Sequence, residues 1–148
     1  MKVRSLGEFG LIQRLADRIA RDERQRNARL VIGIGDDAAA WRPDDAIELL
    51  PTDTLMQDVH FRLGVGTWRD LGWKALAVNV SDIAAMGGAP RYAVVTLGLP
   101  ADTDVSAMDE LYEGMLDMAD QYPVVIVGGD IVTAPVFFVS IALVGAAP

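Results

Sequence analysis

The sequence TWRDLGWKALAVNVSDIAAMGG, residues 67–88, contains the clearest helix of the chain and sets the fold expected around it. Thr67 is suited to cap the helix, and Asp70, three residues later, completes a capping-box pattern. The residues between are mostly apolar and small, and the glycines at 87–88 are typical helix terminators. We therefore expect a predominantly apolar helix over residues 67–86.

On both sides of this segment, helical and extended patterns follow one another. Apolar residues recur at intervals of three and four over residues 6–26 and 104–122, which predicts two amphipathic helices. Short apolar runs predict strands over residues 30–34, 46–50, 91–99, 124–127 and 136–144. This order indicates an α+β, or mixed α/β, fold rather than regular βαβ repetition. The basic residues at the end of the first helix are interpreted as a solvated face; they are Arg18, Arg21, Arg24 and Arg26.

Composition and charge restrict the class of protein. With 148 residues, 51% of them hydrophobic and 23% charged, the chain can form one globular domain with a substantial core. No apolar run approaches the ~20 residues of a membrane span, and no signal peptide is recognised, so we expect a cytoplasmic protein. The absence of cysteine excludes disulfides and thiolate metal sites. A net charge of −8 argues against nucleic-acid binding, but not against a nucleotide held through Mg²⁺.

Aspartates at the ends of apolar runs are the main chemical signal. Asp37 follows a strand in GIGDDAA, Asp53 lies in TDT with Thr52 before it, and Asp130 follows a glycine pair in GGD. Asp82 is embedded in the apolar helix and needs a partner. Each motif alone has a structural alternative, a turn or a backbone-bound side chain. Together, oxygen ligands and adjacent glycines predict a site for Mg²⁺ and a phosphorylated ligand, most simply a nucleotide.

Other nucleotide motifs are missing. No G-x-x-x-x-G-K-[ST] and no G-x-G-x-x-G occurs, so the P-loop and Rossmann interpretations lose their main support. His60 is the only histidine, and a single histidine is weak support for a metal site. Its position close to TDT and beside a phenylalanine leaves two interpretations open, a structural histidine and a ligand contact.

Several motifs together resemble one family, the thiamine-monophosphate kinases. They are GEFGLI (7–12), GIGDDAA (33–39), TDTL with VHF (52–61), DLGWKALAVNVSDIAAMGG (70–88) and GGD (128–130). The resemblance covers essentially the whole chain but only the N-terminal half of those enzymes. Its superfamily includes aminoimidazole ribonucleotide synthetase, selenophosphate synthetase and the hydrogenase-maturation dehydratase. It implies that residues 1–148 form an N-terminal ATP- and Mg²⁺-binding dimerisation domain, a mixed sheet flanked by helices, with the C-terminal domain absent from this sequence.

The resemblance also implies a reaction and a set of ligands. The reaction is ATP-dependent phosphorylation of thiamine monophosphate to thiamine diphosphate, by direct in-line transfer without a catalytic side chain. The implied Mg²⁺ ligands are Asp37, Thr52, Asp53, Asp82 and Asp130. Gly129, Asp130 and Tyr112 are implied to bind ATP, and His60 the thiamine substrate. The N-terminal half alone is expected to be inactive.

The implied partner is a second copy of the chain, with the two sheets pairing into a β-barrel. The apolar strands 91–99 and 136–144, taken as unpaired edges, also favour a homodimer. The sequence departs from the family pattern at Pro51, where a small hydroxyl residue is usual, and at Ile131 and Val132, where Thr-Thr-Arg is usual. Two alternatives therefore stay open: another ATP-dependent member of the superfamily with a different small-molecule substrate, and a non-catalytic nucleotide-binding or dimerisation domain.

Overall fold

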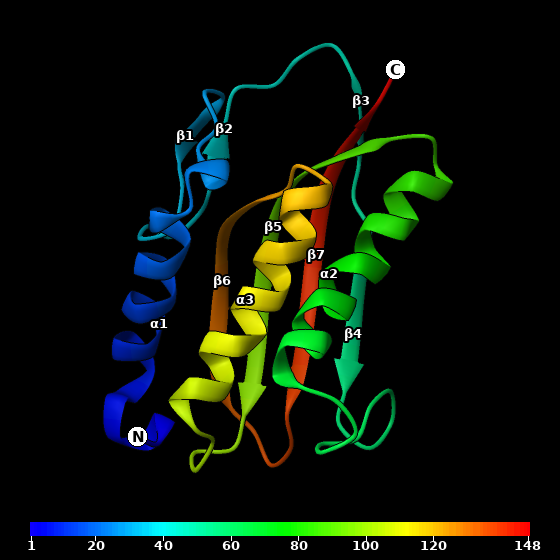
Figure 1. The fold of residues 1–148 in the computed structure, drawn as a ribbon. Helices are drawn as coiled ribbons and strands as arrows, with labels where there is room; N and C mark the ends of the chain where they lie inside the picture. The colour runs from blue at the N-terminus through cyan, green and yellow to red at the C-terminus, as the bar shows by residue number, and fades with distance from the viewer.

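The computed structural model describes the whole chain, from Met1 to Pro148, and combines three α-helices with seven strands (Figure 1). The helices are α1 (Val3–Arg21), α2 (Trp68–Ala85) and α3 (Val105–Gln121), with a short 3₁₀ turn at Glu23–Gln25. The strands are β1 (Leu30–Ile32), β2 (Ala40–Trp41), β3 (Ile47–Leu49), β4 (Thr52–Met56), β5 (Ala89–Leu99), β6 (Val125–Thr133) and β7 (Phe138–Ala147). None of the helices combines the length and the apolar composition needed to cross a membrane.

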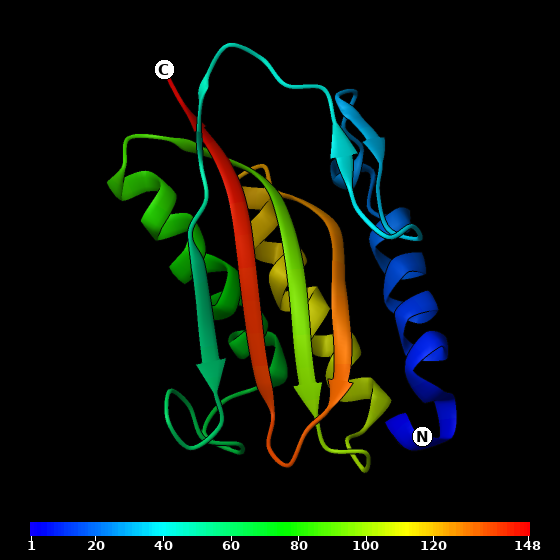
Figure 2. The ribbon, with the colours of Figure 1, turned by 180° about the vertical axis from the view of Figure 1, so that it is seen from behind.

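A five-stranded mixed sheet organises the domain. Its order is β3-β7-β5-β6, and β4 also pairs with β7, beyond the residues that β3 covers. Strands β5 and β6 are parallel, whereas β3, β4 and β5 all run antiparallel to β7. Helices α2 and α3 cover one face, and Figure 2 shows the opposite face without a helix over it. Helices therefore cover one face only, and on the other face Leu30, Ala39 and Trp41, from the region of β1 and β2, pack on a small buried cluster of Tyr92, Val125 and Val127.

Helices α2 and α3 approach each other at backbone distance. A Cβ added at Gly72 would overlap the backbone carbonyl of Leu111, and one added at Gly114 would overlap that of Arg69. Each helix thus presents a glycine to the backbone of the other, and neither position has room for a side chain. This contact fixes the spacing of the two helices on the sheet.

Helix α1 differs from the expected helix over residues 6–26. It begins at Val3, contains Gly7 in a non-helical conformation with φ of 75°, and ends at Arg21. Asp22 leaves the helical conformation, and its side chain accepts a hydrogen bond from the backbone N–H of Arg24 at 3.0 Å. The aspartate therefore starts a separate 3₁₀ turn in place of continued helix.

The expectations for α2 and α3 are confirmed. Thr67 and Asp70 form the capping box, and α2 ends within one residue of the expected boundary. The strand ends are where the sequence prediction is wrong. Thr52 and Asp53 lie inside β4, not in a turn after a strand, because pairing with β7 extends through them. Asp130 does not close its strand either, since β6 continues to Thr133 alongside β5.

The expectation that strands 91–99 and 136–144 are unpaired edges is also wrong. They correspond to β5 and β7, and each has neighbours on both sides. The apolar surface that the sheet leaves open is consequently a face, not an edge.

Candidate functional site

A cavity of about 640 Å³ lies between α1, the loop at residues 34–39 and strand β6, and is called the α1–β6 cavity below. Its wall is apolar, and its polar edge carries three carboxylates. The apolar lining includes Phe9, Ile12, Leu15, Ile19 and Ile126, and the carboxylates are those of Asp36, Asp37 and Asp130. A volume of this size is typical of small-ligand sites.

The charge of this cavity restricts what it can hold. No lysine, arginine or histidine lines it, whereas Asp36, Asp37 and Asp130 do. The backbone of Gly35 and Gly128 is exposed to the same space. A phosphate group placed there would meet only like charge unless cations lay between. The donor set, carboxylate oxygens without soft ligands, suits Mg²⁺, so the residues present fit a magnesium-bound phosphate and not a bare one.

The carboxylates at the edge are held by local hydrogen bonds. Asp36 accepts from the backbone N–H of Asp37 at 2.8 Å, and Asp130 accepts from the backbone N–H of Ile131 at 2.9 Å. Both bonds use Oδ1, which leaves Oδ2 free of them. Asp36, Asp37 and Asp130 are all exposed, so their carboxylates are accessible to a cation from solvent.

Tyr112 supplies the only phenol in the cavity lining. It lies on α3 with only 5% of its surface exposed, and burial raises the pKa of its phenol well above the ordinary value. The hydroxyl therefore stays protonated throughout the physiological range and can donate a hydrogen bond to a ligand. Gly129, Asp130 and Tyr112, the three residues implied to bind ATP, line this one cavity.

Gly129 also has a structural reason to be glycine. A Cβ at this position would overlap the backbone carbonyl of Val95 on the neighbouring strand. At Gly128, by contrast, a Cβ would stand 3.5 Å from the Val94 side chain, which is ordinary contact. The pairing of β6 with β5 thus requires glycine at position 129. Gly128 is not required by this packing, and its lack of a side chain leaves the cavity open.

The remaining implied metal ligands lie elsewhere in the chain. Thr52 and Asp53 are on β4, which β7 and β5 separate from β6, and Asp82 is exposed on α2. The hydroxyl of Thr52 donates to the carbonyl of Ile141 at 3.0 Å. No group of three or more His, Cys, Asp or Glu side chains stands close enough to hold one metal ion. A single chain therefore brings Asp37 and Asp130 together and leaves Asp53 and Asp82 apart from them.

His60 lies in a second cavity, of about 340 Å³, between the β4–α2 loop and the start of α2. Its Nδ1 accepts a hydrogen bond from the backbone N–H of Met56 at 3.0 Å, so in the neutral ring Nε2 carries the proton. Arg62, Lys74 and Trp68 share this cavity, which has no lining residue in common with the first. The histidine is thus a local loop anchor with one nitrogen available to a ligand.

The loop that carries Asp36 and Asp37 is anchored to the sheet through a neighbouring ion-pair cluster. Asp44, after β2, accepts hydrogen bonds from Arg91 of β5 at 2.7 and 3.0 Å and from Arg29, before β1, at 2.5 Å. The guanidinium of Arg91 lowers the pKa of Asp44 far below its usual range. The carboxylate is therefore charged at neutral pH and holds both flanks of the β1–β2 pair.

Sequence reasoning missed the contribution of α1. Its apolar residues line the α1–β6 cavity, and the interpretation of its basic residues as a solvated face is wrong for Arg18, which is half-buried, whereas Arg24 is exposed. Arg18 pairs with Asp109 and Glu113 of α3, and Arg24 with Asp22 and Asp120. Helical periodicity marks both faces of α1, but only the position of α3 shows which element each face meets.

An α+β domain with these features can hold a phosphorylated ligand through cations, in an apolar cavity edged by carboxylates and glycine backbone. Residues 35–147 match the family model of the AIR synthase related protein, N-terminal domain, and the chain belongs to this family.

Two curated relatives and one solved structure show how far the similarity extends. The chain is 39% identical over 142 residues to thiamine-monophosphate kinase of Bacillus subtilis (strain 168), covering 95% of this chain and 42% of that protein. It is 41% identical over 143 residues to thiamine-monophosphate kinase of Mycobacterium tuberculosis (strain ATCC 25618 / H37Rv), covering 97% and 41%. A structure of AaThiL complexed with AMPPCP and TMP superposes with a TM-score of 0.67 at 37% identity, covering 98% and 43%. The chain thus spans about two-fifths of the length of these relatives.

Proposed function

We propose that the α1–β6 cavity binds ATP through Mg²⁺, and that the protein phosphorylates thiamine monophosphate to thiamine diphosphate in the cytoplasm. The observation that carries the proposal is the charge of the cavity, which has three carboxylates and no basic side chain. A triphosphate can enter such a site only with bound cations. The similarity to thiamine-monophosphate kinases, one of them solved with AMPPCP and TMP, supports ATP and thiamine monophosphate as the ligands.

The residues of this chain have distinct proposed roles. Asp37 and Asp130 hold Mg²⁺ at the cavity edge, and Tyr112 and the backbone of Gly129 contact the nucleotide. Mg²⁺ held there would neutralise charge on the phosphates. The acceptor is itself a phosphate oxyanion near neutral pH, so no side chain has to act as a strong general base.

The other residues implied by the resemblance belong to the same proposal. Thr52, Asp53 and Asp82 are proposed as further Mg²⁺ ligands. In the single chain, Thr52 and Asp53 lie on β4, which β7 and β5 separate from Asp130 of β6, and Asp82 lies on α2. His60, through its free Nε2, is proposed to contact the thiamine substrate. The proposed metal ligands on β4 and α2, and His60, would have to act together with parts of the protein that lie outside this chain or in a second copy of it.

The function is tested by the release of ADP from ATP and Mg²⁺ by the full-length protein, with and without thiamine monophosphate. We expect release that depends on both thiamine monophosphate and Mg²⁺. Release with a different small-molecule acceptor would assign another substrate within the family. Mg²⁺-dependent ATP binding without turnover on any acceptor would indicate a binding domain, the interpretation that Ile131 and Val132 favour.

We also propose that a second copy of the chain covers the open face of the sheet. This face carries exposed Val94 and Val132 and a polar row in which Thr54 donates to Ser140 at 2.8 Å. An open sheet face of this kind is suited to pairing with its own copy. We expect a dimer in sedimentation velocity, and a monomer for Ala142→Glu, which places a charge on the middle strand of that face. A wild-type monomer well above micromolar concentration would refute the dimer.

A further inference from the structure

Helix α1 forms the outer wall of the α1–β6 cavity. Phe9, Ile12 and Ala16 line the cavity at helical spacing, and Ile19 continues the same side. Phe9 is 82% exposed, so its side chain makes few contacts with the rest of the protein. The width of the cavity therefore depends on where α1 stands relative to β6 and α3.

The attachment of α1 to the rest of the domain is narrow. Its main packing partners are α3, β6 and the 3₁₀ turn, and its buried residues are few: Val3, Leu11, Leu15 and Ile19. In Figure 1 the helix stands at the side of the sheet, next to β6, and not over the face that α2 and α3 cover. Interactions that fix its position should accordingly be concentrated along the α1–α3 seam.

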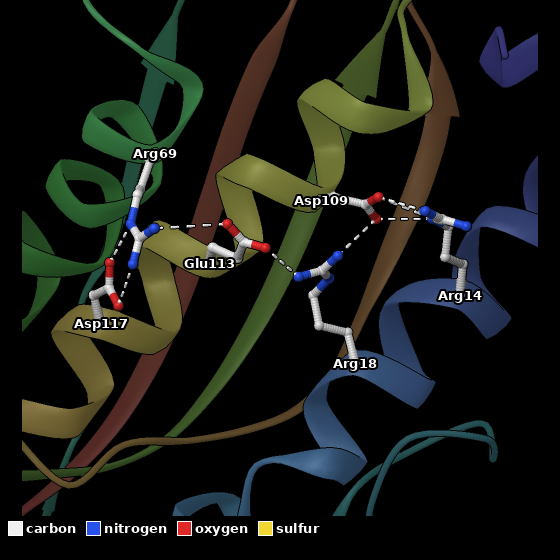
Figure 3. A network of polar contacts seen from close by, with 6 residues as sticks. All are labelled: Arg14, Arg18, Arg69, Asp109, Glu113 and Asp117. Carbon is white, nitrogen blue, oxygen red and sulfur yellow. Dashed lines mark hydrogen bonds and ion pairs between the residues drawn. The ribbon is translucent and has the colours of Figure 1, made fainter.

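Ion pairs run along that seam (Figure 3). Arg14 of α1 donates to both carboxylate oxygens of Asp109, with Nη2 at 2.6 Å and Nε at 2.8 and 3.1 Å. Arg18, one turn later, lies 3.5 Å from Asp109 and 2.5 Å from Glu113. Asp109 is the best buried of these carboxylates, with a side chain 12% exposed. The guanidinium of Arg14 lowers the pKa of Asp109, which keeps the ion pair intact at neutral pH.

The position of Asp109 on α3 connects this seam with the cavity. Asp109 precedes Tyr112 by three residues, so the two side chains are neighbours on the helix surface. Leu15, which follows Arg14, lines the cavity as Tyr112 does. The hydrogen bonds between Arg14 and Asp109 thus connect α1, which forms the cavity wall, to the turn of α3 that carries Tyr112.

We propose that Asp109 is a positioning residue for the α1–β6 cavity, which holds α1 through Arg14 and Arg18 at the distance from Tyr112 that a nucleotide requires. It touches no ligand itself. The nucleotide part of this inference rests on the function proposed above, whereas the hold on α1 does not.

Another ion pair on α3 gives a matched control. Asp117 binds Arg69 of α2 at 2.6 and 2.9 Å, in the same two-pronged geometry as Asp109 and Arg14. Helices α2 and α3 are already joined by backbone contact at Gly72 and Gly114, and neither Asp117 nor Arg69 lines the α1–β6 cavity. Asp109→Asn and Asp117→Asn therefore remove pairs of the same geometry, of which the Asp117 pair is the more exposed, but only the first loosens the cavity wall. Arg69 also lies 3.7 Å from Glu113, the partner of Arg18, and Asp117→Asn leaves both of these residues in place.

The test measures amide hydrogen exchange in residues 8–21 and binding of AMPPCP with Mg²⁺, both in the full-length protein. For Asp109→Asn we expect faster exchange in α1 and a dissociation constant for AMPPCP raised at least about fivefold, the loss of one charged hydrogen-bond pair. For Asp117→Asn we expect α1 exchange unchanged and a change in the dissociation constant below about twofold. If turnover is measured, KM for ATP should rise in Asp109→Asn while kcat at saturating ATP stays the same.

A second variant tests the route of the effect. Arg14→Gln with Arg18→Gln should reproduce the weaker AMPPCP binding, and adding Asp109→Asn should weaken it no further. Unchanged α1 exchange in Asp109→Asn, or equal effects of Asp109→Asn and Asp117→Asn, would overturn the inference. If the wild type itself binds no AMPPCP, the proposed function fails, and the exchange rates of α1 still decide whether Asp109 holds the helix.

Discussion

Replacing Gly72 by alanine is expected to lower the free energy of unfolding by about 3 kcal/mol, the upper part of the range for overpacking a core. The added methyl group would overlap the carbonyl of Leu111, which belongs to the backbone of α3 and cannot turn aside. Relief requires α2 and α3 to separate. Separation would in turn open the core beneath them, where Leu76 and Met108 are completely buried.

Gly114→Ala is expected to have an effect of similar size, because it inserts a methyl group into the same contact between α2 and α3, against the carbonyl of Arg69. The double variant should cost less than the sum of the two, since helices already separated by one methyl accommodate the second more easily. Urea denaturation followed by far-UV circular dichroism measures all three.

Gly10→Ala in α1 is the matched control. There the methyl would meet the Leu6 side chain, 2.9 Å away at Cγ, and a half-buried side chain can turn. The gain in helix propensity offsets the adjustment, so the free energy of unfolding should stay within about 1 kcal/mol of the wild type. A Gly72→Ala variant as stable as Gly10→Ala would show that α2 and α3 do not touch as described.

These glycines show which features the sequence alone could predict. The capping box of Thr67 and Asp70 was predictable because its partners are three residues apart, and the structure has both of its hydrogen bonds. Nothing local marks Gly72 or Gly114 as contact positions. From the sequence alone, a glycine within a helix indicates only a lower helix propensity, and its contact with a neighbouring helix is visible only in the structure.

Strand ends illustrate the same limit. Asp53 and Asp130 looked like residues after a strand because glycine, proline and carboxylates follow apolar runs there. Both lie inside strands, because β7 and β5 extend the hydrogen-bond ladder past them. Local preference was overridden by long-range pairing, which a single sequence does not display. The residue types of the candidate site were nevertheless predictable, because carboxylates next to glycines carry their chemistry wherever the strand ends.

Asp130→Asn is expected to reduce kcat/KM for ATP in the full-length protein at least about 100-fold, a loss typical of removing a group that binds metal or developing charge. The reason is the absence of any basic side chain in the α1–β6 cavity, so carboxylate charge alone would recruit the cations that phosphates need. Asparagine keeps the Oδ1 that accepts from the N–H of Ile131, so the exchange removes charge and preserves the local structure.

The Mg²⁺ dependence of the reaction separates this explanation from a general loss of folding. If Asp130 binds the metal, Asp130→Asn should need a higher Mg²⁺ concentration for half-maximal rate, while its thermal midpoint stays that of the wild type. Asp102→Asn, a change of the same charge in an exposed turn, should leave both the rate and the Mg²⁺ dependence unaltered. A value of kcat/KM for Asp130→Asn within about threefold of the wild type would contradict the role, since a carboxylate that binds Mg²⁺ at a phosphate site without basic side chains cannot be lost without a larger cost.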